Sequence, residues 1–177
     1  MNFSHRIATL DDTDAIIALM ELSMRKLLPN VLTPAQVERS TDSMGFDTQL
    51  VADGTYILVF EDDVLVGSGG WSRRRTLFGS DDTAGRDDAL ADPATEPAKI
   101  RAMYTHPDHT RKGIGSLILD LAEAAARAEG FKSIEMGSTA PGRLLYEQRG
   151  YVFVEDLSPQ YEDGTVVPIL RMRKSLV

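Results

Sequence analysis

Hydrophobic positions recur with two different spacings along the chain, helical near the N-terminus and extended from residue 55 onward. Apolar residues at helical spacing follow the acidic pair Asp11-Asp12, which predicts an amphipathic helix with an acidic N-terminus. Thr33 and Pro34 predict the start of a second helix, because threonine caps well and proline is tolerated at the first helical position. Two extended runs, 55–61 and 64–71, flank a pair of aspartates and predict a β-hairpin.

The second half of the chain predicts a strand, a helix and another strand in succession. Residues 99–105 form the first strand, and residues 117–129 form an amphipathic helix that stops at Gly130. Residues 132–137 form the next strand, and a helical crossover between two strands predicts that they pair in parallel. A short helix and two closing strands complete the pattern, over residues 144–149, 151–155 and 168–174.

Residues 73–98 interrupt this pattern. Six carboxylates lie between Asp81 and Pro97 against the single Arg86, and few apolar residues are available to hold the segment on a core. Long connections of this kind are functional covers or disordered segments. We therefore expect a mobile loop, partly disordered, that faces the substrate.

Composition limits the class of protein. A chain of 177 residues suits one domain with one core, spanning residues 1–177. No apolar run approaches the roughly 18 residues that cross a bilayer, and the first residues lack the apolar core of a signal peptide, so we expect a cytoplasmic protein. The absence of cysteine excludes disulfides and thiolate catalysis, and a net charge of −8 argues against a nucleic-acid surface.

The segment Arg111–Ser116 carries the strongest sign of chemistry. Gly113 and Gly115 permit a tight turn between a strand and a helix, where free amides and the helix dipole favour a phosphate. The Walker pattern fails because Lys112 precedes its glycine, and the dinucleotide pattern fails because Ile118 stands where a third glycine is needed. A pyrophosphate cradle and an ordinary tight turn both fit these residues.

Two longer stretches resemble the GNAT superfamily of acyl-CoA-dependent N-acetyltransferases. Residues 98–115 resemble its acyl-CoA-binding motif, and residues 140–151 resemble its second hallmark, a short helix with Leu-Tyr before a Gly-aromatic strand start. The resemblance extends from His5 to the C-terminus and is sharp in these two blocks. It implies a mixed α/β domain whose largely antiparallel, twisted sheet contains a splayed parallel strand pair and is flanked by helices.

The resemblance also implies an activity and a site. The protein would move an acetyl group from acetyl-CoA to a primary amine of a small molecule by direct nucleophilic attack, and no metal takes part. Tyr146 corresponds to the family's tyrosine that donates a proton to the leaving thiolate, although packing beside Leu145 would also explain it. The residues expected to bind the cofactor are Met103, Tyr104, Thr105, Arg111, Lys112, Gly113, Ile114, Gly115 and Ser116.

The general base stays open. Some family members have a glutamate where this chain has Lys99; Glu96 lies nearby, and proton transfer through water is an equal alternative. Thr110 stands where the family usually has Arg or Gln, and Arg111 compensates or the backbone holds the pyrophosphate.

Other residues allow two interpretations each. Trp71 fits either an acceptor pocket or the core, and the run 73–75 of three arginines fits either a contact to the adenosine 3′-phosphate or an exposed turn. His106 and His109 are three apart, but no carboxylate set completes a metal site, so surface histidines are expected.

Alternative functions remain at this point. Lys99 at the base position favours a non-catalytic acyl-CoA-binding sensor, while a peptide or protein N-acetyltransferase and a plain phosphate-binding domain are further alternatives. The acidic loop favours a cationic amine, and no nucleic-acid or membrane partner is expected. Homodimers are common in the family that the chain resembles.

Overall fold

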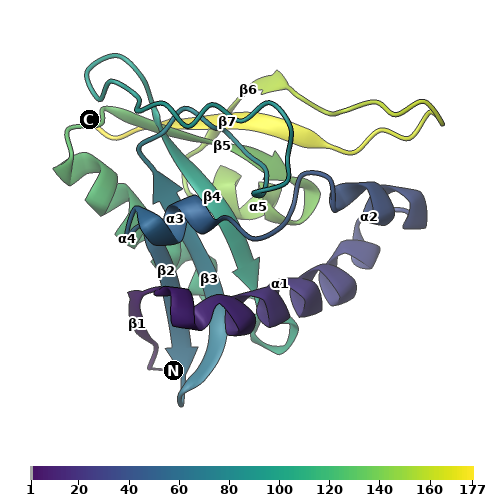
Figure 1. Ribbon diagram of the computed structural model, residues 1–177, viewed down its shortest axis with the longest axis horizontal. Helices are drawn as coiled ribbons and strands as arrows, with labels where there is room; N and C mark the ends of the chain where they lie inside the picture. The colour runs from purple at the N-terminus through teal and green to yellow at the C-terminus, as the bar shows by residue number, and fades with distance from the viewer. Residues whose placement is uncertain (1) are drawn as a thin grey trace.

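Seven strands form one mixed sheet in the order β1-β2-β3-β4-β5-β7-β6, in which only β4 and β5 pair in parallel (Figure 1). The computed structural model describes residues 2–177. The strands are β1 (Ser4–Ile7), β2 (Tyr56–Glu61), β3 (Val64–Ser72), β4 (Ala98–Thr105), β5 (Ser133–Thr139), β6 (Val152–Asp156) and β7 (Ile169–Ser175). The α-helices are α1 (Thr13–Leu27), α2 (Pro34–Ser40), α3 (Thr48–Ala52), α4 (Ile114–Ala128) and α5 (Arg143–Gln148).

Helices cover both faces of the sheet, so its central strands are apolar on both sides. On β2, Ile57 and Val59 belong to the core cluster beneath α4, whereas Tyr56 and Leu58 belong to the cluster beneath α1 and α3. Successive side chains of a strand point to opposite faces, which produces this division. The predicted mixed sheet flanked by helices is confirmed.

The glycines of β3 allow the helix α4 to approach the sheet. A Cβ at Gly67 would overlap the Ile114 side chain, and one at Gly69 would lie 3.1 Å from Ile118 Cγ2. A Cβ at Gly70 would instead overlap the backbone of Thr55 on the neighbouring chain segment. At all three positions the absence of a side chain makes room for other parts of the protein.

Two elements lie outside the predicted pattern. The strand β1 pairs antiparallel with β2 at one edge of the sheet, and the short helix α3 follows the side-chain cap of Asp47. Thr33 caps α2 as expected, through a capping box with Gln36. The other helices and strands lie where they were predicted, with ends displaced by a few residues.

The connection between β3 and β4 is held by many polar contacts. A short bridge pairs Arg74 with Leu90, and the Arg74 guanidinium binds Asp53 at 2.8 Å. Ala91 is buried against the core. These contacts give the segment more anchors than its composition indicated, while its mobility stays a prediction.

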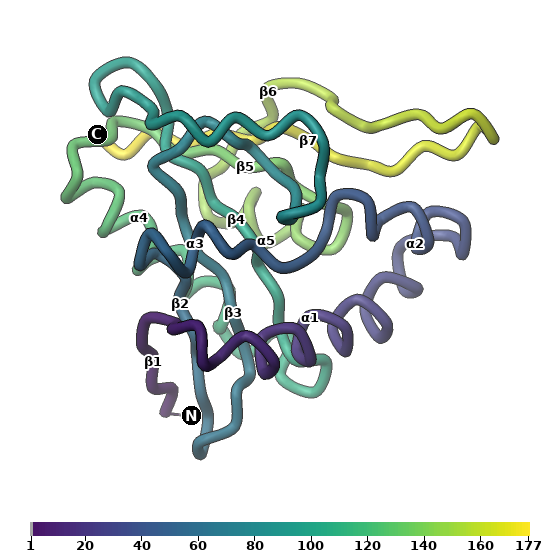
Figure 2. The backbone as a smooth tube through the Cα atoms, in the orientation of Figure 1, coloured from purple at the N-terminus to yellow at the C-terminus, as the bar shows by residue number. Residues whose placement is uncertain are grey.

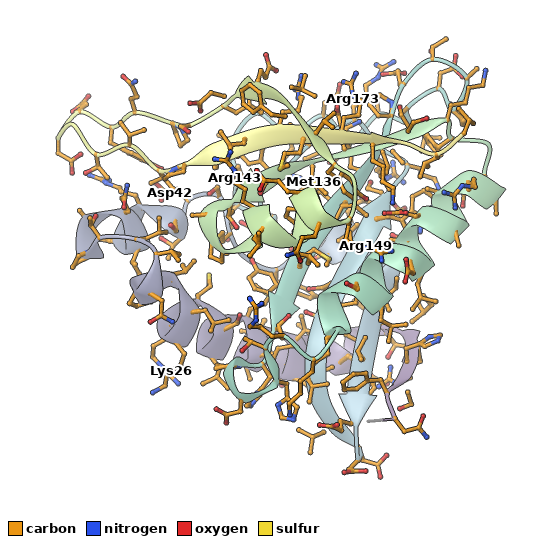
Figure 3. All side chains as sticks on the ribbon, turned by 180° about the vertical axis from the view of Figure 1, so that it is seen from behind. Lys26, Asp42, Met136, Arg143, Arg149 and Arg173 are labelled. Atoms are coloured by element: carbon orange, nitrogen blue, oxygen red, sulfur yellow. The ribbon has the colours of Figure 1, made fainter. Side chains whose placement is uncertain are left out.

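Two further contacts join segments that are far apart in the sequence. In Figure 2 the hairpin connection between β6 and β7 runs beside α2, and Gln36 Nε2 donates to the Val166 carbonyl at 2.8 Å. Seen from behind in Figure 3, α5 lies beside α4, and Arg149 near the end of α5 pairs with Asp120 of α4. Within residues 2–177, none of the helices has the length and apolarity needed to cross a bilayer.

Candidate active site

The strands β4 and β5 separate soon after they begin. They pair only at Ala98 with Ile134 and at Lys99 with Glu135, although β4 continues to Thr105. Backbone N–H and C=O groups are obligatory hydrogen-bonding groups, so the parted edges can accept another extended molecule. The predicted splayed parallel pair is confirmed.

A β-bulge shapes β4 where the strands part. Opposite the single residue Gly69 of β3, β4 supplies two residues, Ala102 and Met103. Ala102 has φ 55°, in the left-handed region that non-glycine residues rarely adopt. Bulges re-aim side chains and are common beside active sites. Here the bulge falls at Met103, one of the residues expected to bind the cofactor.

The turn before α4 has the geometry of an anion-binding site. Gly113 is the N-cap of α4 with φ 89°, and Arg111 has φ 60°. The first helical hydrogen bond runs from Leu117 N to Gly113 O at 3.0 Å, so the preceding amides at 114–116 have no partner within the helix. The helix starts three residues before the predicted residue 117, which places Gly115 and Ser116 in its first turn.

A cavity of about 470 Å³ lies between this turn, the end of β4, α5 and the last turns of α1; we call it the α4 cavity. It brings together eight of the nine residues expected to bind the cofactor: Met103, Tyr104, Thr105, Arg111, Gly113, Ile114, Gly115 and Ser116. The exception is Lys112, whose Nζ lies 3.9 Å from Glu61 Oε2. His109 Nε2 lies 3.0 Å from the same carboxylate oxygen. Lys112 therefore faces the β2–β3 hairpin.

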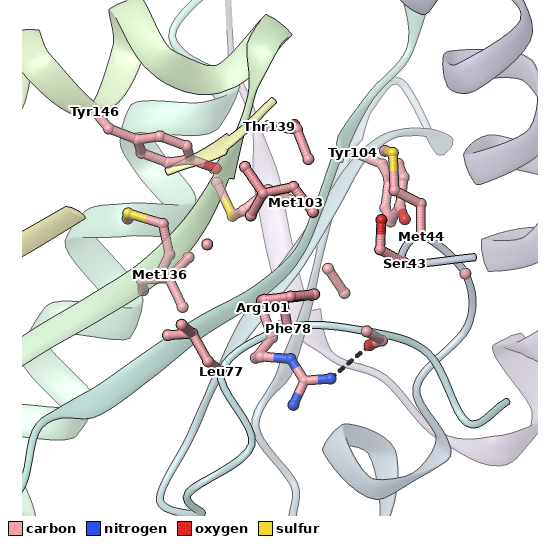
Figure 4. Close-up of a pocket in the computed structure, with 16 residues that line it drawn as sticks. Ser43, Met44, Leu77, Phe78, Arg101, Met103, Tyr104, Met136, Thr139 and Tyr146 are labelled. Carbon is pink, nitrogen blue, oxygen red and sulfur yellow. Dashed lines mark hydrogen bonds between the residues drawn. The ribbon is translucent and has the colours of Figure 1, made fainter. Parts of the chain in front are cut away.

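A second, smaller cavity lies on the other side of the opening, between β4, β5 and the segments around residues 43–45 and 77–79; we call it the β5 cavity (Figure 4). The two cavities share five lining residues: Met44, Met103, Tyr104, Thr139 and Tyr146. The two cavities therefore meet at the parting of the strands.

Tyr146 projects from α5 into this meeting point. Its ring packs on Gly142, where a Cβ would lie 2.6 Å from Tyr146 Cε2, and meets the Tyr151 ring edge-on at 5.9 Å between centroids. The hydroxyl points toward the space beside Thr139 and Met103 (Figure 4). Burial raises the pKa of the Tyr146 hydroxyl above its usual value, so the group stays protonated at neutral pH.

Tyr104 lies across the opening from Tyr146. It is 6% exposed, and burial raises its pKa to about 12. Two protonated phenols therefore border the junction of the two cavities.

The two residues considered from the sequence as general bases, Lys99 and Glu96, line neither the α4 cavity nor the β5 cavity. Lys99 Nζ donates to the Pro97 carbonyl at 2.6 Å and lies 3.6 Å from Glu135 Oε1, and burial lowers its pKa. Glu96 binds Arg75 at 2.8 Å. Lys99 and Glu135 instead join β4 to β5 just below the point where the strands part.

The remaining ambiguous residues have structural partners. Trp71 is 3% exposed and packs edge-on against Phe131, so it belongs to the core. Arg73 pairs with Glu129 at 2.6 Å, and its neighbours Arg74 and Arg75 are also paired with carboxylates. His106 and His109 face each other with 3.3 Å between their Nδ1 atoms.

Several cavity residues were not predicted from the sequence. Met44, Leu77 and Phe78 lie in connections without periodic pattern, and Thr139 extends β5 two residues past its predicted end. Long-range folding brings these segments to the site. The local sign was the pair Leu77 and Phe78, two large apolar residues in a polar connection.

Comparison with known proteins agrees with this geometry. The acetyltransferase (GNAT) family model matches residues 17–151, which include β4, the strand that lines both cavities, and the helix α5. The chain belongs to the acetyltransferase (GNAT) family.

The individual relatives either match only part of the chain or have less than 20% sequence identity. The uncharacterized N-acetyltransferase YsnE of Bacillus subtilis is 34% identical over 84 residues, which cover 45% of this chain and 56% of that protein. A GCN5-related N-acetyltransferase from Rhodopseudomonas palustris has a TM-score of 0.69 at 18% identity, covering 99% of this chain and 96% of that one. PaiA from Thermoplasma acidophilum, solved in complex with coenzyme A, has a TM-score of 0.65 at 14% identity, covering 99% of both chains. YncA from Salmonella typhimurium, solved with acetyl-CoA, has a TM-score of 0.62 at 18% identity, covering 99% and 94%.

Proposed function

We propose that the protein transfers an acetyl group from acetyl-CoA to a primary amine of a small molecule by direct attack. The observation that carries this proposal is the meeting of two cavities where β4 and β5 part. One cavity suits the donor and the other suits the acceptor, so the two substrates would react at their junction. Family membership and neighbours solved with coenzyme A or acetyl-CoA support the choice of donor.

The α4 cavity offers the groups that a CoA thioester needs. The amides at 114–116 and the Arg111 side chain would bind the pyrophosphate, because free helix N-terminal amides and a guanidinium both favour phosphate oxygens. The unpaired edge of β4 from Ile100 to Thr105 would bind the pantetheine amides. This arrangement would deliver the thioester carbonyl to Met103.

At the junction, the amine nitrogen attacks the thioester carbon and the carbon–sulfur bond breaks. The Met103 amide would stabilise the negative charge that develops on the carbonyl oxygen. The Tyr146 hydroxyl would protonate the departing thiolate, for which its protonated state and its position are suited. The excess proton on the amine nitrogen passes to water, and the Tyr146 phenolate takes a proton back from solvent, which restores the enzyme.

The residues that line the β5 cavity, all within 2–177, include no Asp, Glu or His. We therefore expect the amine to react as the free base that binds from solution, since burial without a carboxylate partner disfavours the ammonium form. For an alkylamine with a pKa of about 10.4, kcat/KM should rise about tenfold per pH unit from neutrality towards that value. A plateau beginning near neutral pH, in initial rates measured at subsaturating amine, would instead reveal a base on the enzyme.

The lining of the β5 cavity, which within residues 2–177 has no carboxylate or imidazole, also supports a second function, an acyl-CoA-binding sensor. A sensor would bind acetyl-CoA and release no thiol with any amine. An enzyme would release coenzyme A thiol in proportion to the amine supplied.

Isothermal titration with acetyl-CoA, combined with the variant Gly113→Ala, tests the donor site. A Cβ at Gly113 meets nothing within 4 Å, so the substitution adds only the cost of a left-handed conformation, about 1 kcal/mol. If the turn distorts to relieve the left-handed conformation, acetyl-CoA must restore the original turn when it binds. Its Kd should then rise about fivefold.

Gly164→Ala is the matched control for this substitution. Gly164 also has a positive φ, of 83°, and open space around it, but it lies in the connection between β6 and β7. Its replacement should lower stability to a similar degree and leave the Kd for acetyl-CoA unchanged. Equal effects of both variants on binding, or no binding by the unmodified protein, would contradict the donor site.

A further inference from the structure

We propose that the acceptor is a monoamine with a compact apolar body, and that Phe78 selects it. This inference rests on the proposed function and names the substrate class of the same site. It departs from the cationic acceptor that the acidic composition of residues 73–98 favoured.

Half of the residues that line the β5 cavity have apolar side chains, and apart from Arg101 the polar side chains among them are uncharged. The apolar side chains come from both parted strands and from the two connections that face them: Met44, Leu77, Phe78, Ile100, Met136 and Ile169. Methionine side chains adapt to an irregular apolar ligand, because they are unbranched and polarizable. A second ammonium or a carboxylate in such surroundings would lose its hydration and meet hydroxyls and backbone groups, with no unpaired opposite charge.

Arg101 is the one charged residue that lines the cavity within residues 2–177, and its charge is already paired. Its guanidinium lies 2.6 Å from Asp47 Oδ2 and donates to the Gly79 carbonyl at 2.6 Å and the Thr76 carbonyl at 3.3 Å. Figure 4 shows this guanidinium directed at the 77–79 segment and away from Tyr146. Arg101 therefore anchors the wall of the cavity and leaves no free positive charge for an acceptor carboxylate.

Phe78 packs on Gly137 of β5 and forms part of the wall of the β5 cavity. A Cβ at Gly137 would lie 2.9 Å from Phe78 Cδ1 and 3.2 Å from Phe78 Cβ, so the glycine makes room for the ring. On the other side, Phe78 borders an outer cavity that is lined by Asp42, Asp81 and Asp82. Phe78 therefore lies, with Ser43, Met44 and Gly45, between the β5 cavity and the carboxylates of the outer cavity.

The test compares three amines that share a chain of five carbons and differ at the far end. Pentylamine ends in a methyl group, diaminopentane in an ammonium and aminopentanoate in a carboxylate. We expect kcat/KM, measured by thiol release at saturating acetyl-CoA, to be at least tenfold higher for pentylamine than for either analogue. Preference for diaminopentane would assign the acceptor to the outer carboxylates, and preference for aminopentanoate would assign it to Arg101; either result overturns the inference.

Variants test the role of Phe78. Phe78→Ala should reduce the preference for pentylamine over diaminopentane at least threefold, whereas Phe153→Ala, at a residue 58% exposed on β6, should leave it unchanged. Gly137→Ala should raise the KM for pentylamine by pushing the ring into the cavity, without changing the Kd for acetyl-CoA. An unchanged preference in Phe78→Ala together with an unchanged KM in Gly137→Ala would overturn the assignment.

Two outcomes separate this inference from the proposed function. Turnover of diaminopentane or aminopentanoate in preference to pentylamine would retain the acetyltransferase and reject the apolar acceptor. Binding of acetyl-CoA with no turnover of any of the three amines would overturn the inference, and the same result across a wider panel of amines would overturn the enzyme assignment.

Discussion

Replacing Tyr146 with phenylalanine is expected to lower kcat at saturating amine and acetyl-CoA by about 100-fold, the lower range for loss of a general acid. The change removes one oxygen at the junction of the two cavities and keeps the ring that packs on Gly142 and Tyr151. The Kd for acetyl-CoA and the melting temperature should therefore change little. Turnover by coupled thiol detection and binding by titration separate the two effects.

Tyr161→Phe is the matched control, because its hydroxyl lies in the connection between β6 and β7, 3.4 Å from the Arg39 carbonyl and beside Asp42. Its kcat should equal that of the unmodified protein. A Tyr146→Phe enzyme with full kcat would remove the acid role, and equal losses in kcat and in acetyl-CoA affinity would indicate a packing role instead.

The fold could be predicted from local patterns because most of its elements carry their own signals. The helix α4 has a regular apolar stripe and a glycine near each end, and the crossover from β4 to β5 follows from the order of elements. By contrast, all four residues of β1 are exposed, so no alternation marks that strand. The helix α3 spans five residues, too few for a helical period to show.

The turn before α4 and the parting of β4 from β5 could be predicted from the sequence, and the β5 cavity could not. Gly113 indicates the turn before α4 because glycine readily adopts the positive φ found there, and Gly115 leaves space for the Leu145 side chain, which a Cβ would approach to 2.6 Å. The β5 cavity depends on Met44, Phe78 and Met136, which lie in three segments far apart in the sequence. Local periodicity carries no information about which distant segments meet.

The connection between β3 and β4 illustrates the same limit. Its carboxylates suggested an open acidic surface, but Glu96 binds Arg75 and Asp88 lies 3.4 Å from Arg86. Arg101, whose buried guanidinium binds backbone carbonyls of this segment, looks in the sequence like an ordinary polar position of a strand. Charge counts along a chain therefore overstate the field at a site when the partners of the charges are distant.

That buried arginine gives the largest expected effect on stability. Asp47→Ala should lower the free energy of unfolding by about 3–5 kcal/mol, because removal of one partner leaves an uncompensated buried charge. Asp47 is 1% exposed and Arg101 3% exposed in their side chains, and Arg86 lies 3.3 Å from the same carboxylate. The substitution also removes the N-cap of α3, whose Gln49 amide donates to Asp47. Urea unfolding followed by circular dichroism measures the loss.

Asp163→Ala is the matched control, since Asp163 and Arg39 form an ion pair whose side chains are 49% and 42% exposed. Exposed pairs contribute about 0–1 kcal/mol, so this variant should unfold near the midpoint of the unmodified protein. Asp47→Asn, which keeps a side-chain oxygen for the cap and removes the charge, distinguishes the two causes. If the asparagine variant is as stable as the unmodified protein, the buried charge pair does not hold the 77–79 wall. If it loses most of the stability that the alanine variant loses and raises the KM for the amine, then the Arg101 pair shapes the acceptor cavity as well as stabilising the fold.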